Sequence, residues 1–208
     1  INDEIDRLRL RATSALLSGD PRVIVVASVS CIYGIGAPEE WINQTLVVRK
    51  GEGGGRQALL KRLVEMLYTR NDYEFVRGTF RVRGDIVEII PGYENEEALR
   101  IEFFGDHVER IAYVNRVDGK VLGETDFEVV YPAKQFVTSR ATIDRALGPI
   151  ETELKERTAE LTSLGKLVEA QRIQQRTRFD MEMMREVGYC QGIENYSRHL
   201  AQRLPGSR

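Results

Sequence analysis

Short β-rich segments separated by glycine–aspartate pairs restrict the fold of this 208-residue chain more than any other feature. The segments GTFRVR and IVEIIP lie on either side of Gly84-Asp85, and two residues of this kind between β-rich runs predict a hairpin. Gly105-Asp106 and Asp118-Gly119 separate further strand candidates, which lie at 99–104, 108–114, 120–122 and 127–131. Because strands joined by short turns pair antiparallel, the sequence predicts a meander.

One strand and one helix precede this meander. Residues 44–49 are a strand candidate, and the glycine-rich stretch after it is typical of a loop. A helix is predicted over 57–69, and Asn71 is expected to end it. Its apolar side consists of Leu59, Leu60, Leu63, Val64 and Leu67. The middle of the chain is therefore expected to be a small α+β domain.

Alternation along the strands assigns the two faces of the predicted sheet, because successive side chains point to opposite sides. Phe80 and Val82 point one way, as do Leu99, Ile101 and Phe103. The opposite face then carries Thr79, Arg81, Arg83, Arg100 and Glu102. A solvated surface is the ordinary explanation for charged residues in this pattern.

The distribution of charge favours a protein partner over duplex DNA for this face. Between Arg70 and Arg83, four arginines stand against two acidic residues, a net of +2. From Asp85 to Glu128, four basic residues stand against twelve acidic ones, a net of −8. A duplex-binding surface is broadly basic. A few arginines on an acidic background suit specific carboxylates of a protein, which guanidinium groups pair with in a planar, bidentate way.

The first forty residues are predicted to belong to an α/β domain. Ile5, Leu8, Ala12 and Leu16 recur at helical spacing, and Gly19-Asp20-Pro21 breaks the helix. The run VIVVASVS that follows is typical of a strand buried on both faces of a parallel sheet. No second run of this kind occurs, so the chain is expected to be a fragment.

The last third of the chain is predicted to be helical. Ser139 is a capping candidate, and Gly148-Pro149 is expected to break or kink the helix early. Residues 136–208 carry 12 basic and 10 acidic residues, a net of +2. Arg172, Arg176 and Arg178, with Phe179 and Tyr189 nearby, suit a nucleic-acid backbone and a stacked base, although a long helical linker with mixed surface charge is the preferred explanation of this pattern. The apolar positions of this helix are Ile143, Leu147, Ile150, Leu154, Leu161, Leu164 and Val168.

The sequence offers no complete catalytic, metal or cofactor site. Its longest wholly apolar run, Val23–Ala27, is far too short to span a membrane. The two cysteines form no CxxC pair, two histidines leave little for a metal site, and a reducing cytoplasm is the expected location. Neither Gly-Lys pair is followed by the hydroxyl residue of a phosphate-binding loop. We therefore expect no cofactor in this segment.

Four long strings of the sequence resemble one family. VIVVASVSCIYGIG, YTRNDYEFVRGTFRVRGDIVEIIP, LRIEFFGDHVERI and QRTRFDMEMMREVGYCQGIENYSRHL are similar, in this order, to segments of the UvrB family of bacterial nucleotide excision repair. Intact members resemble helicase-like ATPases that UvrA loads onto damaged DNA and that recruit the nuclease UvrC. The resemblance implies ATP and Mg²⁺ for the intact protein, whose ATP-binding loop would lie upstream of Ile1 and whose UvrC-contacting tail would lie downstream.

The resemblance also implies a domain organisation. Residues 1–40 would end a RecA-like motor domain, 41–135 would be an inserted UvrA-interaction domain, and 136–208 would be a helical subdomain near DNA. The UvrA-contacting positions map onto Arg70, Arg77, Arg81, Arg83, Arg100 and Glu102. The DNA-proximal positions map onto Ser28, Ser30, Tyr33, Arg176, Tyr189 and Glu194.

Two alternatives remain open at the level of sequence. The UvrA-binding module of a transcription–repair coupling factor would share the string RGTFRVRGDIVEIIP, although the tail MEMMREVGYCQGIENYSR favours UvrB. A stand-alone DNA-binding domain is the second alternative, and the net charge of −8 over 85–128 argues against it.

Overall fold

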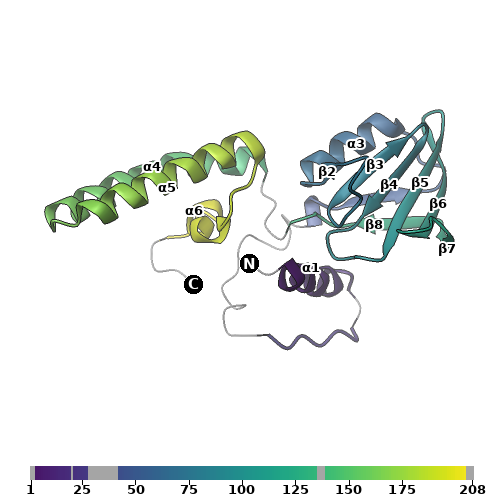
Figure 1. The fold of residues 1–208 in the computed structure, drawn as a ribbon, viewed down its shortest axis with the longest axis horizontal. Helices are drawn as coiled ribbons and strands as arrows, with labels where there is room; N and C mark the ends of the chain where they lie inside the picture. The colour runs from purple at the N-terminus through teal and green to yellow at the C-terminus, as the bar shows by residue number, and fades with distance from the viewer. Residues whose placement is uncertain (1–2, 20, 28–41, 135–138, 205–208) are drawn as a thin grey trace. The chain divides into compact units, whose positions relative to one another are not determined.

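The computed structural model describes residues 3–19, 21–27, 42–134 and 139–204 (Figure 1). The chain divides into two compact units, Ile1–Val26 with Trp41–Gln135 and Ala27–Glu40 with Phe136–Arg208. The first contains antiparallel sheets with helices, and the second is helical in its described part. This mixture of helices and antiparallel sheet confirms the predicted fold class.

The first unit, here called the sheet unit, contains two helices and eight strands in its described part. The helices are α1 (Asp3–Leu17) and α3 (Gly55–Glu65). The strands are β1 (Leu46–Arg49), β2 (Thr69–Arg70), β3 (Thr79–Arg83), β4 (Ile86–Ile90), β5 (Glu97–Phe104), β6 (His107–Asn115), β7 (Val121–Thr125) and β8 (Phe127–Val130).

Six of these strands form one sheet, in the order β2-β3-β4-β5-β6-β7. Strands β3 to β7 are the predicted meander, whereas β2 begins where a helix was predicted and the strand predicted at 127–131 lies outside this sheet. Every pair from β3 onward is antiparallel, and only the short β2 runs parallel to its neighbour. Gly84 adopts a left-handed φ of 61° in the β3–β4 turn, which confirms the hairpin and explains the glycine there. Strands β1 and β8 pair separately as an antiparallel ribbon.

The main core lies between α3 and one face of the sheet, which we call the inner face (Figure 1). Phe80, Ile101 and Phe103 are buried there, as the alternation predicts. Arg81, Arg100 and Glu102 are only partly covered on the opposite, outer face. The core cluster consists of Val48, Leu59, Leu63, Met66, Tyr68, Phe80, Val87, Ile89, Leu99, Ile101, Phe103, Val108, Ile111, Val130 and Ala133.

Helix α3 ends earlier than predicted, at Glu65 rather than near Asn71. Leu67 takes the left-handed φ of 64° that usually selects glycine, and the amide of Tyr68 donates to the carbonyl of Leu63 at 3.0 Å. Tyr68 is buried, and its hydroxyl donates to the carbonyl of Tyr131 at 2.7 Å. The helix therefore ends where Tyr68 can be buried and hydrogen-bonded, and not at Asn71, the residue that the local sequence favours as a helix end.

The beginning of the chain confirms one prediction and corrects two. Helix α1 forms as predicted, but Leu10 is its buried leucine, whereas Leu8 is 50% exposed. The predicted buried strand from residue 23 is wrong in its described part. Residues 23–27 form no strand, and Ile24 and Val26 are 90% and 96% exposed. Among the described residues no strand pairs with this run, so its backbone has no ladder to join.

The second unit, here called the helical unit, is built on a hairpin of two long helices, α4 (Arg140–Ser163) and α5 (Leu167–Val187) (Figure 1). The short η2 (Ile193–Tyr196) and α6 (Ser197–Leu200) follow. Ser139 caps α4 as predicted, because its hydroxyl accepts from the amide of Thr142 at 3.2 Å. The core consists of Ile143, Ala146, Leu147, Ile150, Met181, Met184, Cys190, Ile193 and Leu200.

Two details of the helical prediction need correction: the helix does not break at Gly148-Pro149, and two positions assigned to its apolar side are exposed. Pro149 lies inside α4 without ending it, because it is on the exposed side, where water can bond the carbonyl that loses its partner. Leu164 and Val168 are 61% and 57% exposed instead of belonging to the apolar side. They flank the turn between the two helices, where Gly165 adopts a left-handed φ of 72°.

Candidate docking face of the sheet unit

The hairpin register brings a buried carboxylate between two of the predicted arginines. Arg81 on β3 lies opposite Glu88 on β4, and Glu88 lies opposite Arg100 on β5. Directly opposed residues point to the same face, so all three side chains meet on the outer face. We call Arg81, Glu88 and Arg100 the central arginine cluster.

Both guanidinium groups of the central arginine cluster bind the same carboxylate. Arg81 Nε donates to Glu88 Oε2 at 2.5 Å, and Arg100 Nε and Nη2 donate to Oε1 at 2.9 and 2.8 Å. Glu88 is only 4% exposed. The Arg81 guanidinium also lies 4.0 Å above the ring centre of Phe75. These two arginines are therefore held by their own domain.

Opposing effects act on the protonation of Glu88. Burial raises the pKa of its carboxyl, but the hydrogen bonds from Arg81 and Arg100 outweigh burial and hold the pKa below its ordinary value. Glu88 is consequently ionised at neutral pH and neutralises part of the charge on the two arginines.

A second group, here called the edge arginine cluster, consists of Arg70, Asp72 and Arg83. Arg70 Nε donates to Asp72 Oδ2 at 3.1 Å, while Asp72 Oδ1 accepts from the amide of Val82 at 3.1 Å. These two bonds lower the pKa of Asp72, the backbone bond most, and the nearby charge of Arg83 adds to the effect. The Arg83 side chain is exposed and forms no hydrogen bond or ion pair with another described residue. The edge cluster thus presents cationic groups to solvent.

Glu102 joins a third set of charges further along the same face. Arg110 donates to Glu102 at 3.2 Å and to Glu124 at 2.6 Å. Arg110 and Glu88 were absent from the predicted site. The signal for Glu88 was present in the sequence, because a two-residue turn at Gly84-Asp85 places residue 88 opposite residue 81.

Arg77 differs from the other predicted arginines. It donates to Asp3 Oδ2 at 3.0 Å, to Asp6 Oδ2 at 3.1 Å and to the carbonyl of Gly92 at 3.0 Å, and its side chain is 11% exposed. Arg77 thus joins α1 to the rest of the sheet unit and belongs to neither the central nor the edge arginine cluster.

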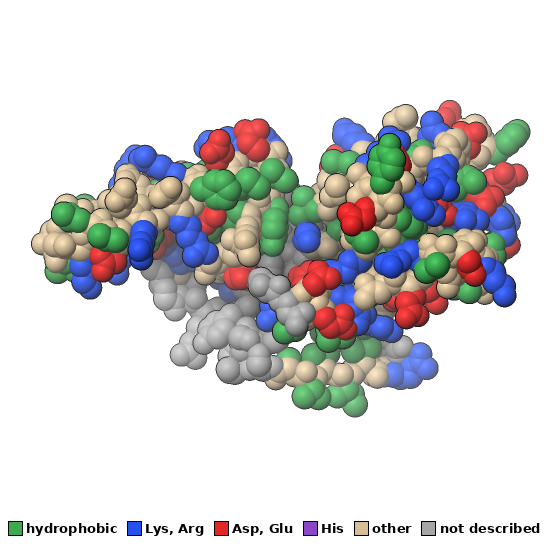
Figure 2. Space-filling model, viewed as in Figure 1, with side chains coloured by type: hydrophobic (Ala, Val, Ile, Leu, Met, Phe, Trp, Pro, Cys, Tyr) green, Lys and Arg blue, Asp and Glu red, His purple; other side chains and the backbone are tan. Residues whose placement is uncertain are grey.

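Part of the outer face is apolar and covered. Ile90, Ala98, Ala112 and Val114 form a small buried cluster there, and Phe75 from the β2–β3 loop packs against it. On the side of the sheet unit that Figure 2 shows, Lys and Arg side chains are interspersed with Asp and Glu. On the outer face, Glu102, Arg110 and Glu124 carry both signs of charge. At the centre of the outer face the arginines are paired with a buried carboxylate, whereas around it exposed side chains of both charges face solvent.

The predicted DNA-proximal residues of the helical unit lie at one corner of it. Arg176 on α5 is 69% exposed and 3.8 Å from Asp180 Oδ2, and Glu194 on η2 is exposed. The pKa of the Cys190 thiol is raised to about 12. Burial contributes most to this shift, the charges of Asp180 and Glu194 add to it, and the charge of Arg176 opposes it. Arg176 and Glu194 therefore both lie near this thiol. Tyr189 is half-buried against the helical core.

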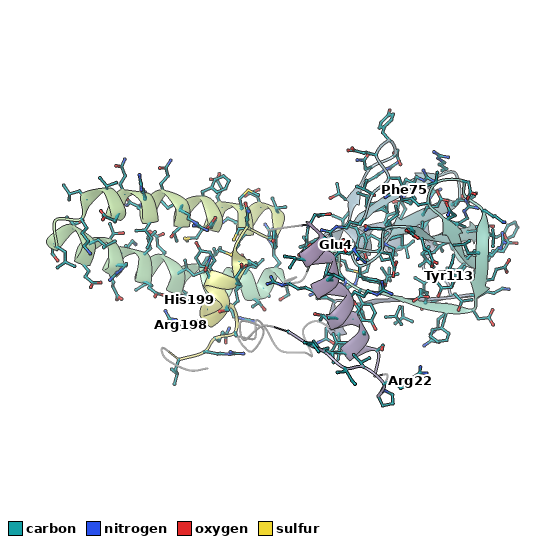
Figure 3. The ribbon with its side chains drawn as sticks, turned by 60° about the horizontal axis from the view of Figure 1, so that its bottom comes forward. Glu4, Arg22, Phe75, Tyr113, Arg198 and His199 are labelled. Atoms are coloured by element: carbon teal, nitrogen blue, oxygen red, sulfur yellow. The ribbon has the colours of Figure 1, made fainter. Side chains whose placement is uncertain are left out.

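A second polar contact in this unit joins α6 to α4. Arg198 and His199, labelled in Figure 3, both bond the carboxylate of Glu153. Burial raises the pKa of Glu153, but its bond to His199 and the charge of Arg198 hold it below the ordinary value. This contact fixes α6 without forming a recognisable active site.

Three predicted positions, Ser28, Ser30 and Tyr33, lie outside the described residues. Within the described part of the chain, no group of three or more His, Cys, Asp or Glu residues is arranged to hold a metal ion. None of the described helices has the length and apolarity to cross a membrane. The sequence also lacks a phosphate-binding loop, so the residues present do not fit an ATP site.

Arginine is enriched in protein–protein interfaces relative to the rest of the protein surface, so an antiparallel sheet with arginines on its exposed face has a composition that suits a protein-docking module. Two family models match the chain in succession: the UvrB interaction domain over residues 46–136 and the UvrB third helical domain over residues 141–202. These matches correspond to the sheet unit and the helical unit.

Whole-chain similarity agrees with the two family models. UvrABC system protein B from Geobacillus kaustophilus and that from Bacillus caldotenax are each 58% identical over 207 residues. The protein of the same name from Chlorobaculum tepidum is 53% identical over 208 residues. All three matches cover 100% of this chain, which spans 30–31% of the relatives' length. The chain belongs to the UvrB family.

Proposed function

We propose that this chain is the part of a UvrB-type nucleotide excision repair protein that docks UvrA through the outer face of its sheet unit. The supporting observation is that the segment matching the UvrB interaction domain carries exposed arginines on an acidic background. Arg70, at the β2 edge of the sheet, and Arg83 are the cations offered to carboxylates of UvrA. Arg81, Arg100 and Glu102 shape the outer face beside them. Arg77 acts indirectly in this proposal, because it is occupied by α1.

Binding of UvrA to the purified chain tests this proposal. Reversing the edge charges with Arg70→Glu and Arg83→Glu should weaken binding at least about 100-fold, since both attractions become repulsions. Lys61→Glu is the matched control, because Lys61 is an exposed cation on α3, across the sheet from the outer face. Wild-type affinity in the double variant, with an unchanged melting curve, would refute the assignment.

The helical unit is the proposed DNA-proximal part. Arg176 would contact a phosphate, Tyr189 would lie near a base and Glu194 would organise the polar corner, with Ser28, Ser30 and Tyr33 contacting the backbone. The exposure of Arg176 and its long ion pair to Asp180 support this role. Replacing Arg176 with Gln should reduce the dependence of DNA affinity on salt by about one phosphate contact. An unchanged salt slope would remove Arg176 from the interface.

The remaining activities belong, in this proposal, to the intact protein. ATP with Mg²⁺, and recruitment of UvrC, would use parts of the roughly threefold longer relatives that this chain does not span. A cytoplasmic location follows, because bacterial DNA lies there. The match to the UvrB third helical domain favours UvrB over the UvrB-like module of a transcription–repair coupling factor.

A further inference from the structure

The loop between β2 and β3 projects an aromatic side chain beside the edge arginine cluster. Tyr73 is 100% exposed and directly follows Asp72, which bonds Arg70 and lies near Arg83. A single exposed aromatic residue is ordinary by itself. The distinguishing feature of Tyr73 is the way its loop is fixed.

The first half of this loop is tied to itself and to β3. The side-chain oxygen of Asn71 accepts from the amides of Tyr73 at 3.1 Å and Glu74 at 2.9 Å. The amide of Asn71 donates to the carbonyl of Phe80 at 2.9 Å, and Asp72 Oδ1 accepts from the amide of Val82. The backbone that carries Tyr73 is therefore ordered before any partner arrives.

The second half of the loop is held by the outer face. Phe75, labelled in Figure 3, packs against the buried apolar cluster and lies beneath the Arg81 guanidinium. The Thr79 hydroxyl donates to the carbonyl of Val76 at 2.6 Å. Both halves of the loop are therefore attached to the sheet, and these attachments fix the position of the backbone at Tyr73. One of them is the contact between Phe75 and Arg81 of the central arginine cluster.

An ordered tyrosine at such a position is well suited to anchor a partner. Tyrosine offers a large contact area with only two side-chain torsions, so burying it costs little conformational entropy. Binding hot spots are enriched in tyrosine and arginine, and they gain from parts that are ordered before association. Tyr73 brings the apolar area, and Arg70 and Arg83 bring the charge.

We propose that Tyr73 is a binding hot spot of the docking face, and that it enters an apolar pocket of UvrA whose rim carries carboxylates for Arg70 and Arg83. This inference rests on the proposed UvrA docking, and it adds an anchor residue and the chemistry of the surface that receives it. The acidic rim follows from charge complementarity with the two exposed guanidinium groups.

Affinity for UvrA, measured for the full chain with three variants, tests the inference. Tyr73→Ala should weaken binding about 30-fold or more, the usual effect of removing a hot spot. Tyr73→Phe should retain most of the affinity, because the ring area is kept. Val64→Ala is the control, since Val64 is 58% exposed on α3, across the sheet from the outer face, and it should bind like the wild type. Melting temperatures should be unchanged.

The outcomes separate this inference from the proposed function. If Tyr73→Ala binds like the wild type while Arg70→Glu with Arg83→Glu does not bind, the hot spot is refuted and docking stands. Equal weakening by Tyr73→Ala and Val64→Ala also refutes it, because general loss of apolar surface would then be responsible. A wild-type chain that fails to bind UvrA refutes both.

Discussion

The central arginine cluster lies on the outer face of the six-stranded sheet and the edge arginine cluster lies at the β2 edge of the same sheet, and their arginines differ in how they are bonded. In the central cluster, two guanidinium groups share the buried carboxylate of Glu88, with bonds of 2.5 to 2.9 Å. In the edge cluster, Arg70 is 55% exposed in its side chain and Arg83 forms no ion pair with a described residue. Arginine therefore stabilises the sheet in the central cluster, whereas in the edge cluster it presents positive charge to solvent.

This difference teaches that an arginine on an exposed strand face need not be a contact residue. Arg81 and Arg100 use part of their N–H groups on Glu88, so only their remaining donors are open to a partner. Pulling either guanidinium group away from Glu88 would leave a buried carboxylate with one partner fewer. Arg70 and Arg83 face no such cost. We therefore expect substitutions in the two clusters to separate stability from binding.

The largest effect on stability is expected from Glu88→Ala. Two partly buried guanidinium groups would lose their common partner, which should lower the free energy of unfolding by about 3 kcal/mol. Urea denaturation measures this change. The control is Glu96→Ala in an exposed turn, which should change stability by less than about 0.5 kcal/mol. Similar values for both variants would show that the central cluster is not structural.

The next effect concerns acid pH. The pKa of Glu88 is lowered in the folded protein, so its ionised form contributes stability that is complete above the unfolded carboxyl pKa of about 4.3. That contribution is lost as the pH falls through the lower folded pKa. Glu88→Gln should therefore cost about 2 kcal/mol at pH 7 and progressively less below about pH 4. Denaturation curves at several pH values would show a constant difference if Glu88 were not responsible.

The smallest stability effect is expected at the edge. Arg70→Ala removes only an exposed ion pair with Asp72, so the free energy of unfolding should change by less than about 0.5 kcal/mol. Its affinity for UvrA should nevertheless fall about tenfold, mainly through slower association. Calorimetric melting and binding kinetics measure the two quantities on the same sample. If Arg70→Ala lowered the free energy of unfolding but left UvrA affinity unchanged, the edge cluster would be structural, contrary to this prediction.

Much of the sheet unit could be predicted because its signals are local. The two-residue turn at Gly84-Asp85 defines the β3–β4 hairpin, and alternation places Arg81 and Arg100 on the outer face. The end of α3 could not be predicted in this way, since burial of Tyr68 imposes a left-handed φ on Leu67. The strand expected from residue 23 also failed, because strand formation depends on partners that local pattern does not supply.

The sequence alone determined the order of strands β3 to β7 and the side of the sheet to which Arg81, Arg83, Arg100 and Glu102 point, because both depend on turn length and on the two-residue period of a strand. Only the tertiary structure decided which arginines form ion pairs within the protein and which are exposed to solvent. Arg77 meets Asp3 across 74 positions of sequence, and Arg81 is held between Glu88 and the ring of Phe75. Such contacts depend on how loops and helices pack onto the sheet, and packing joins residues that no local spacing relates.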